Sequence, residues 1–251
     1  MLDNSLIESF RPISLEEMGK VRLMNRIDTK FVTSIENVGK LLEIASADYR
    51  MQQIGGRSNM PYYTKYFDTS DTLMFSEHQR GKKSRQKIRL RLYEDCGMLP
   101  FIEVKSKNNK GRSRKKRVMM EDGTELAPYF TFLENNSDYN PQLLVPHIEN
   151  HFYRITLVDN AMTERVTIDS CLEFHNLTTG KRISLPEIGI IEWKRDGRNS
   201  DSRLGSILRD LHIHPAGFSK YCIGMAATNP GLKQNRLKSK LRMIDKISPI
   251  L

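Results

Sequence analysis

Two segments near the middle of the chain alternate charged and apolar residues. They are Lys87–Tyr93 (KIRLRLY) and Phe101–Lys105 (FIEVK). Successive side chains of a strand point to opposite faces, so Arg89 and Arg91 share one face of the first segment. The turn-forming sequence at residues 95–97 lies between the two segments. Residues 85–106 are therefore predicted to form a hairpin, in which Glu103 and Lys105 share a face.

The same alternation recurs in the other segments that read as strands. These are Asn25–Thr33, a tyrosine-rich segment after Pro61 that ends at Thr69, Tyr153–Val158, Glu164–Phe174 and Ile183–Lys194. Within them, the residues predicted to share a face are Arg26, Asp28 and Lys30; Arg165, Thr167 and Asp169; and Glu192 and Lys194. The basic run Lys110–Val118 has two rows, Arg112, Arg114 and Lys116 on one side and Lys115 and Arg117 on the other. Any one such set is usually a solvated outer face, but the recurrence of mostly cationic sets favours a basic, anion-binding face.

Helical patterns separate these strands. A helix is predicted to start at Ser14, another is capped by Ser34 and has apolar residues at helical spacing, and others are expected at Ser202–Leu211 and Phe218–Ala227. Residues 124–150 read as irregular or helical. Strands joined by turns favour an antiparallel sheet or barrel, so the fold class is α+β and mainly antiparallel β. We expect one domain over residues 1–230, followed by a basic, helical tail over residues 231–251.

The composition narrows the class of partner. The chain has 251 residues, 38% hydrophobic, with a formal net charge of +10, which favours an anionic partner: nucleic acid, an acidic membrane surface or a phosphate-rich small molecule. The widely spaced Cys96, Cys171 and Cys222 fit a reducing compartment and argue against a structural zinc site. We see no signal-peptide pattern and no apolar stretch near the roughly 20 residues of a membrane helix, so a soluble, cytoplasmic protein is expected. Neither a P-loop nor a GxGxxG motif is present.

A basic face has different consequences in an open and in a closed sheet. On an open sheet it meets water. Inside a closed barrel it cannot be a dry core, because clustered, unpaired cations are costly to desolvate. It would instead line a wet tunnel that holds a polyanion, and the few carboxylates among the cations could hold a divalent metal against phosphate oxygens.

The order and spacing of these segments resemble the VTC domain, over about residues 22–225. This is the catalytic domain of the vacuolar transporter chaperone polyphosphate polymerases, which belong to the triphosphate tunnel metalloenzymes. The resemblance is carried by Arg26–Phe31, Tyr66–Thr69, Lys87–Arg91, Glu103–Lys105, Tyr153–Arg154, Arg165–Asp169, Ile191–Lys194 and Phe218–Tyr221.

The resemblance implies a closed antiparallel β-tunnel with helices packed outside. It implies metal-dependent synthesis of inorganic polyphosphate from ATP, with Mn²⁺ or Mg²⁺. ATP and inorganic polyphosphate would be the partners, nucleic acid is not expected, and a membrane-protein partner would be needed for product export. The residues carried over by position are Arg89, Arg91, Lys105, Arg154, Arg165 and Lys220 as catalytic cations, Arg26, Lys30, Lys194 and one of Lys115 or Lys116 as further substrate-binding cations, and Glu192 as the metal ligand.

One departure bears on the reaction. Hydrolytic and cyclase members of the superfamily often begin with an ExExK strand, and this chain has Arg26-x-Asp28-x-Lys30. The replacement weakens the case for metal-activated water and favours transfer to a phosphate acceptor. It leaves metal binding mainly to Glu192, with Asp28, Glu103 or Asp169 as further candidates. Two alternatives stay open: a tunnel hydrolase of tripolyphosphate or nucleoside triphosphates, and a non-enzymatic binder of RNA or polyphosphate.

Overall fold

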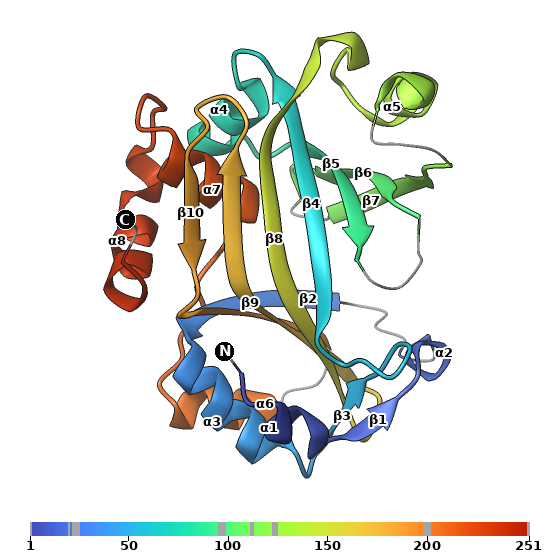
Figure 1. Cartoon of the computed structure of the whole chain (residues 1–251), viewed down its shortest axis with the longest axis vertical. Coiled ribbons are helices and arrows are strands. Elements are labelled where there is room, and N and C mark those ends of the chain that lie inside the picture. The colour runs from blue at the N-terminus through green and yellow to red at the C-terminus, as the bar shows by residue number, and fades with distance from the viewer. Residues whose placement is uncertain are drawn as a thin grey trace.

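A curled, almost entirely antiparallel sheet forms the body of the computed structural model, which describes residues 2–19, 21, 26–94, 99–110, 113–121, 125–197 and 202–249 (Figure 1). The strands are β1 (Arg11–Ile13), β2 (Arg26–Ser34), β3 (Tyr49–Gln52), β4 (Met60–Thr69), β5 (Arg85–Tyr93), β6 (Phe101–Lys107), β7 (Ser113–Met119), β8 (Leu144–Asp159), β9 (Glu164–Asn176), β10 (Arg182–Leu185) and β11 (Ile188–Asp196). The helices are α1 (Asn4–Glu8), α2 (Leu15–Met18), α3 (Ile35–Ala45), α4 (Leu73–Arg80), α5 (Phe130–Asn136), α6 (Arg203–Asp210), α7 (Lys220–Thr228) and α8 (Lys238–Ile247).

The main path of the sheet runs β2-β11-β9-β8-β4-β5-β6-β7. The short strands β1, β3 and β10 are attached to its sides, and β1 pairs with β3 in parallel. The fold class expected from the sequence, mainly antiparallel β with helices outside, is confirmed. The sheet curls as a half-barrel, and in the described parts of the chain its two end strands, β2 and β7, are not paired with each other. Hydrogen bonding between strands therefore leaves one side of the expected tunnel open.

Strand alternation separates an apolar outer face from a charged inner face. On β11, Ile191 and Trp193 are buried in an outer cluster with Leu204 of α6 and Leu41 of α3, while Glu192 and Lys194 point the other way. On β5 and β6, Ile88 and Val104 pack in a second outer cluster beneath α4 and α5. Helices α3, α4, α5 and α6 cover the convex side because that side carries these apolar residues, whereas α7 packs on the same face of β11 as Glu192, against Ile190.

A buried carboxylate ties the outer layer to the sheet. Glu164, at the start of β9, accepts hydrogen bonds from Trp193 Nε1 at 2.7 Å, from Ser202 Oγ at 2.7 Å and from the Tyr49 hydroxyl. These donors come from β11, from the N-cap of α6 and from β3. A buried carboxylate satisfied by several donors fixes the position of α6 on the sheet.

Two sequence predictions about strands were wrong. Residues 144–150 are part of the 16-residue strand β8, although they were read as irregular or helical. Pro146 disguises this strand, and it lies opposite Phe67 where the β4–β8 register shifts, a position that tolerates a missing backbone donor. The predicted strand over Ile183–Lys194 is two strands, β10 and β11, separated at Pro186 and Glu187.

The other elements agree with the expected ones at most positions. The hairpin is formed by antiparallel pairing of β5 with β6, although its predicted turn at residues 95–97 lies outside the described residues. Asn25, Cys96 and Arg112 also lie outside them. Helices α3, α6, α7 and α8 occupy the segments where helical spacing was found. None of the described helices has the length and apolar character needed to cross a bilayer.

Candidate functional site

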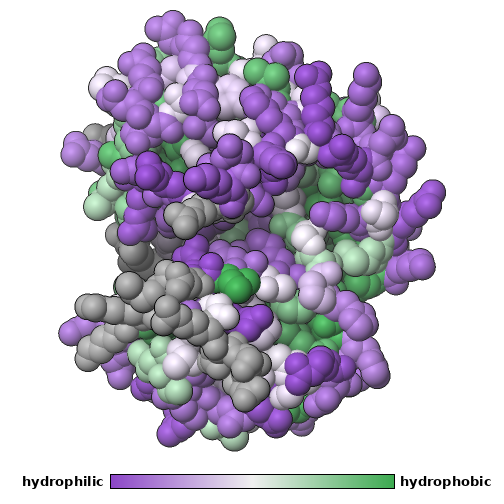
Figure 2. Space-filling model, turned by 180° about the vertical axis from the view of Figure 1, so that it is seen from behind, coloured by the Kyte–Doolittle hydropathy of each residue, from purple (hydrophilic) through white to green (hydrophobic). Residues whose placement is uncertain are grey.

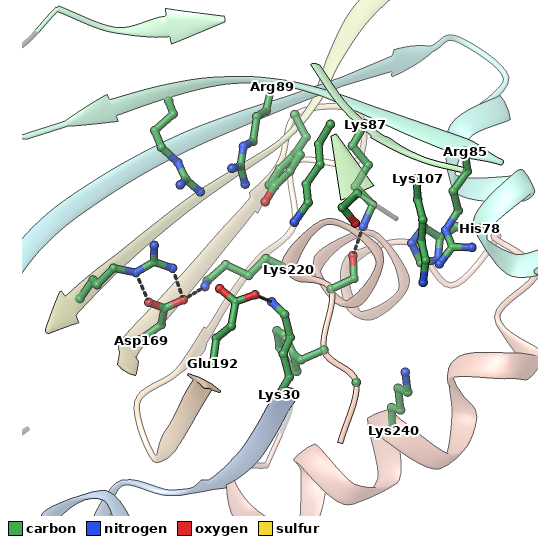
Figure 3. Close-up of a pocket in the computed structure, with 18 residues that line it drawn as sticks. Lys30, His78, Arg85, Lys87, Arg89, Lys107, Asp169, Glu192, Lys220 and Lys240 are labelled. Carbon is green, nitrogen blue, oxygen red and sulfur yellow. Dashed lines mark hydrogen bonds and ion pairs between the residues drawn. The ribbon is translucent and has the colours of Figure 1, made fainter. Parts of the chain in front are cut away.

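The concave face of the sheet encloses a cavity of about 420 Å³ with an unusually cationic lining. The rear face of the molecule is mostly hydrophilic and is hollowed near its middle (Figure 2). The cavity is lined by Lys30, Tyr66, His78, Arg85, Lys87, Arg89, Arg91, Lys105, Lys107, Ser113, Arg154, Asp169, Glu192, Gly217, Phe218, Ser219, Lys220 and Lys240. The strands of the half-barrel supply most of this lining, and residues 217–220 with Lys240 supply a wall that does not belong to the sheet (Figure 3).

The densest row of cations comes from β5. Arg85, Lys87, Arg89 and Arg91 all line the cavity because they occupy every second position of one strand. The antiparallel register places Lys107 opposite Arg85 and Lys105 opposite Lys87. Two neighbouring strands therefore present their cations to the same space.

Glu103 is the counter-charge within this row. It is 1% exposed, and its carboxylate lies 2.6 Å from Arg89 Nη2 and 3.3 Å from Lys115 Nζ. Burial opposes its ionisation, but the charges of Arg89, Arg91 and Lys115 outweigh burial and lower its pKa to about 2. Glu103 thus stays ionised and links β5, β6 and β7.

Asp169 plays the corresponding role on β9. Arg154 donates to both of its oxygens, from Nε at 2.5 Å and from Nη2 at 2.8 Å, and Lys220 donates to the second oxygen. Despite burial, these two cations hold the pKa of Asp169 well below its usual range. The bidentate pair fixes the guanidinium of Arg154 at the cavity wall.

Stacked aromatic rings lie beneath these cations. Tyr62 and Phe152 stack with their centroids 5.2 Å apart. The Arg154 guanidinium lies 5.0 Å from the Tyr62 centroid, and Lys220 Nζ lies 4.0 Å from the Phe152 centroid. The ring faces partly replace the water that the cations lose, and we call this pair the aromatic shelf.

Glu192 is the carboxylate at the β2–β11 side of the cavity. It lies 3.3 Å from Lys30 Nζ and accepts a hydrogen bond from Lys194. Its burial favours the neutral acid, but Lys30, Lys194 and Arg154 hold its pKa well below the usual range. Glu192 is therefore a permanent anion among cations.

The carboxylates fit a metal ion only when phosphate is also present. No group of three or more His, Cys, Asp or Glu side chains that could hold a metal is found within the described ranges. Mg²⁺ and Mn²⁺ are commonly held by one or two carboxylates together with substrate phosphates and water. Glu192 and Asp169 line the same cavity and match that donor set, whereas Glu103 and Asp28 are not among the residues that line it.

The lysines of the cavity are held at unusually low pKa. Burial lowers the pKa of Lys220 to about 7, and neighbouring cations add to the effect. Burial likewise lowers the pKa of Lys87, Lys105 and Lys194 to about 8 and that of Arg91 to about 10. The Nε atoms of Arg91 and Arg165 are buried without a hydrogen-bond partner. Cations outnumber carboxylates in the lining of the cavity, and a polyanion would supply the missing negative charge.

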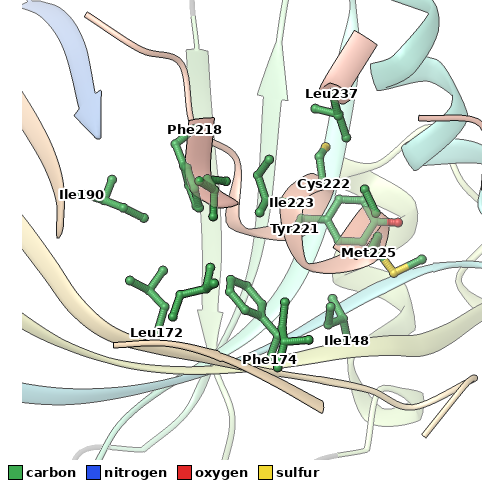
Figure 4. Close-up of a cluster of buried hydrophobic side chains, with 14 of the residues drawn as sticks. Ile148, Leu172, Phe174, Ile190, Phe218, Tyr221, Cys222, Ile223, Met225 and Leu237 are labelled. Carbon is green, nitrogen blue, oxygen red and sulfur yellow. The ribbon is translucent and has the colours of Figure 1, made fainter. Parts of the chain in front are cut away.

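Helix α7 fixes the position of Lys220. Its Tyr221, Cys222, Ile223 and Met225 are buried in an apolar cluster with side chains of the sheet, including Ile148, Leu172, Phe174 and Ile190 (Figure 4). Ser219 is the N-cap of the helix, and its hydroxyl accepts hydrogen bonds from the Cys222 backbone N–H and from Lys87 Nζ. Lys220 is the first residue of the helix and projects into the cavity.

The motif Tyr66–Thr69 has a structural part in this arrangement. Asp68 is fully buried, and its carboxylate accepts from the backbone N–H groups of Met74 and Phe75 at 2.9 Å each and from the Tyr221 hydroxyl. It thus joins the first turn of α4 to the first turn of α7. Asp68 is therefore a positioning residue for Lys220, because its carboxylate binds the hydroxyl of Tyr221, the next residue in the sequence.

The structure brings together most of the residues selected from the sequence. Lys30, Arg89, Arg91, Lys105, Arg154, Lys220 and Glu192 line the cavity. Lys194 is bound to Glu192. Arg165 is close enough to Arg26, Glu192 and Arg154 for their charges to affect its pKa, which burial lowers first of all. Arg26 lies at the same edge, 2.7 Å from Asp28.

Lys115 and Lys116 are separated by strand alternation. Lys115 reaches Glu103 on the inner face. Lys116 points the other way and lines a separate cavity beside α5, with Asn135 and Ser137. Of the two alternatives, the geometry therefore supports Lys115, and the assignment of Lys116 to the tunnel is corrected.

Several lining residues were not selected from the sequence. Arg85, Lys87 and Lys107 extend the alternating rows of β5 and β6 and could have been found by continuing the same parity. His78 and Lys240 come from α4 and α8, and no local pattern connects those helices with the strands.

Comparison with known proteins places the chain in a family. Residues 25–229 match the model of the VTC domain. The chain belongs to the VTC domain family. A search of curated protein sequences found no match.

Solved structures with a similar arrangement share little sequence with this VTC domain protein. A putative adenylate cyclase from Vibrio parahaemolyticus has 13% identity and a TM-score of 0.47, covering 80% of this chain and 97% of the other. One from Bacillus halodurans has 13% identity and a TM-score of 0.47, with coverage of 78% and 96%. A putative adenylyl cyclase from Hippeastrum, described as having a dominant triphosphatase activity, has 14% identity and a TM-score of 0.46, with coverage of 81% and 96%.

The lowered lysine pKa values predict a pH-dependent affinity for anions. A bound polyanion favours protonated lysines, so binding of tripolyphosphate should take up protons wherever Lys220, Lys87, Lys105 and Lys194 are partly neutral. Affinity should fall as the pH rises from about 7 to about 9. Isothermal titration calorimetry in buffers of different ionisation enthalpy measures both effects.

Lys220→Arg is the control for that experiment. Arginine stays charged throughout this range, and the ligand's own titration is common to both proteins. The variant should therefore show a weaker fall in affinity than the wild type. An identical pH profile in the two proteins would contradict the low pKa of Lys220.

Removing the Tyr221 hydroxyl should destabilise the fold. Tyr221→Phe deletes the hydrogen bond to buried Asp68 and should lower the free energy of unfolding by about 1–3 kcal/mol, because a buried carboxylate loses a donor. Tyr153→Phe is the matched control, since Tyr153 is 44% exposed and should change stability by less than about 0.5 kcal/mol. Urea denaturation measures both, and equal stabilities would show that the Asp68 contact is unimportant.

Proposed function

We propose that this VTC domain protein is a polyphosphate polymerase that transfers the γ-phosphoryl group of ATP to the end of an inorganic polyphosphate chain, with a divalent metal. The observation that carries the proposal is the convergence of cations from β2, β5, β6, β8 and α7 on one cavity, with carboxylates at one side of it. The family match supports the substrate class. ATP and inorganic polyphosphate are the proposed partners.

The reaction requires positioning and charge neutralisation more than acid–base catalysis. A terminal phosphate oxygen of the chain attacks the γ-phosphorus of ATP, the bond from that phosphorus to the β–γ bridging oxygen breaks, and ADP leaves with the bond's electrons. The attacking oxygen is already anionic at neutral pH, so no side chain has to remove its proton. Phosphoryl transfer of this kind depends on in-line alignment and on stabilising charge on the phosphoryl oxygens.

The contacts of each residue indicate its proposed role in the reaction. Arg154 and Arg89 are fixed by Asp169 and Glu103 and can hold phosphate oxygens in a constant geometry. Arg91 has an unpartnered Nε and Lys105 lacks an ion pair within the described part of the chain, so these two have free donors for substrate. A divalent metal bound at Glu192 would neutralise charge on the phosphates of ATP. Lys30 and Lys194, which contact Glu192, would then turn toward phosphate oxygens.

Transfer is favoured over hydrolysis by the β2 edge. At the positions of an ExExK strand, Arg26 replaces the first acid and holds Asp28 at 2.7 Å. A carboxylate neutralised in this way is a poor partner for a metal-bound water. Incubation of the purified protein with ATP and Mn²⁺, followed by gel analysis of the products, tests the proposal. Long chains support the polymerase, orthophosphate alone supports a hydrolase, and binding without turnover supports a non-enzymatic binder.

Arg91→Ala should lose most of the activity without unfolding. The variant removes a cation whose Nε is unpartnered, and the expected loss of turnover is on the order of 10²-fold, as for other groups that stabilise transition-state charge. Lys116→Ala is the control, because it removes one positive charge from the opposite face of the same sheet. Rates of chain growth are compared after thermal unfolding has shown both variants to be folded. Equal rates for Arg91→Ala and wild type would contradict the assignment.

Glu192→Gln should separate binding from turnover. The substitution keeps the side-chain volume and removes the charge that pairs with Lys30 and Lys194. Metal-dependent turnover should be lost, while metal-free binding of tripolyphosphate is retained or tightened, because the site becomes more positive. Turnover with an unchanged dependence on Mn²⁺ concentration would show that Glu192 does not hold the metal.

A further inference from the structure

The two ends of the cavity differ in charge. Both carboxylates of its lining, Asp169 and Glu192, lie at one end with Lys30 and Lys220 (Figure 3). At the other end the labelled side chains are His78, Arg85, Lys107 and Lys240, and the lining residues there include no carboxylate. We call this second group the distal cluster.

The distal cluster depends on helix α8, which lies beyond the residues that match the VTC domain. Leu237 and Ile244 are buried in the apolar cluster of α7 and hold α8 against it. The guanidinium of Arg236 packs over Gly81 so closely that a Cβ there would lie 2.0 Å from it. The start of α8 is thereby fixed against the end of α4, the helix that carries His78.

Lys240 is directed into the cavity by this packing. Its Nζ lies 3.2 Å from the place a Cβ on Gly217 would occupy, next to the residues that lead into α7. It is half-buried and has no ion-pair partner within the described residues. Its charge, with those of Lys87 and Arg85, lies close enough to His78 to favour the neutral imidazole, although burial is the larger cause of the lowered pKa. Three positive side chains, Arg85, Lys107 and Lys240, thus face one space around a neutral histidine.

These features suit a particular part of a phosphate polymer. Interior phosphates of a polyphosphate chain carry about one charge each and can be bound by cations alone, whereas the triphosphate of ATP carries more charge and commonly binds with a metal and carboxylates. The end with Glu192 and Asp169 matches the second requirement, and the distal cluster matches the first. The two ends of the cavity therefore differ in charge in a way that binding of a triphosphate alone would not require.

We propose that Lys240, with His78, Arg85 and Lys107, forms a subsite for the interior phosphates of the bound polyphosphate chain, at the end of the cavity away from Glu192 and Asp169. This rests on the proposed function as far as the identity of the polymer is concerned. Chains too short to extend from the Asp169 end to Lys240 do not gain from the subsite. Helix α8 thus makes affinity dependent on chain length.

Metal-free binding measurements test the subsite directly. The probes are tripolyphosphate and a linear polyphosphate several times longer, titrated into the full chain by calorimetry. The wild type should bind the longer chain more tightly per chain. Lys240→Ala should weaken binding of the longer chain about 3- to 10-fold, a typical effect of losing one charge-assisted contact, and should leave tripolyphosphate unchanged. Lys240→Arg should retain most of the affinity.

Lys238→Ala is the matched control, because Lys238 is an exposed lysine two positions earlier on the same helix. It should leave both affinities unchanged. The subsite is overturned if Lys240→Ala weakens both ligands equally, weakens neither, or is matched by Lys238→Ala. These binding measurements involve no turnover, so their outcome does not depend on whether the protein is a polymerase. Failure of the polymerase proposal would show separately, as the absence of ATP-dependent chain growth in the wild type.

Discussion

Repulsion between like charges on a concave surface is the constraint that the rest of this structure has to satisfy. Cations from four strands and two helices face one cavity, and their mutual repulsion and lost hydration both oppose folding. Three carboxylates reduce this repulsion, and each of them contacts two of the cations. Glu103 contacts Arg89 and Lys115, Asp169 contacts Arg154 and Lys220, and Glu192 contacts Lys30 and Lys194. Enough positive charge is left over to bind a polyanion.

The apolar residues provide the opposing stabilisation from the convex side. Ile88, Leu90, Ile102 and Val104 alternate with the cations of β5 and β6 and are buried beneath α4 and α5. Trp193 and Ile191 alternate in the same way with Glu192 and Lys194 and are covered by α3 and α6. Burial of this area is the favourable term that keeps the charged face assembled. The aromatic shelf adds a smaller contribution inside the cavity, where ring faces of Tyr62 and Phe152 lie against cations.

Period-two alternation made much of this predictable. It identified the faces of β2, β5, β6, β9 and β11, because side-chain direction in a strand follows from parity alone. Parity could not decide between Lys115 and Lys116, since either row of β7 can face inward until the pairing with β6 is known. It also could not reach His78 or Lys240, which arrive from helices distant in sequence. Pro146 prevented the prediction of the first part of β8, because a proline is not expected inside a strand, but a register shift accommodates it there. The end of β10 before Pro186 was also not predicted.

The strict alternation of β5 has a consequence for how this chain can change in length. Insertion of one residue before Ile88 would turn Arg89 and Arg91 toward Met74 and Phe67 and would turn Ile88 and Leu90 into the cavity, because a shift of one position exchanges the two faces of a strand. Core and site would then fail together. An insertion of two residues would restore both faces with the register displaced. Natural or engineered length variation in this strand is thus restricted to even steps, whereas the turns at its ends are free of that rule.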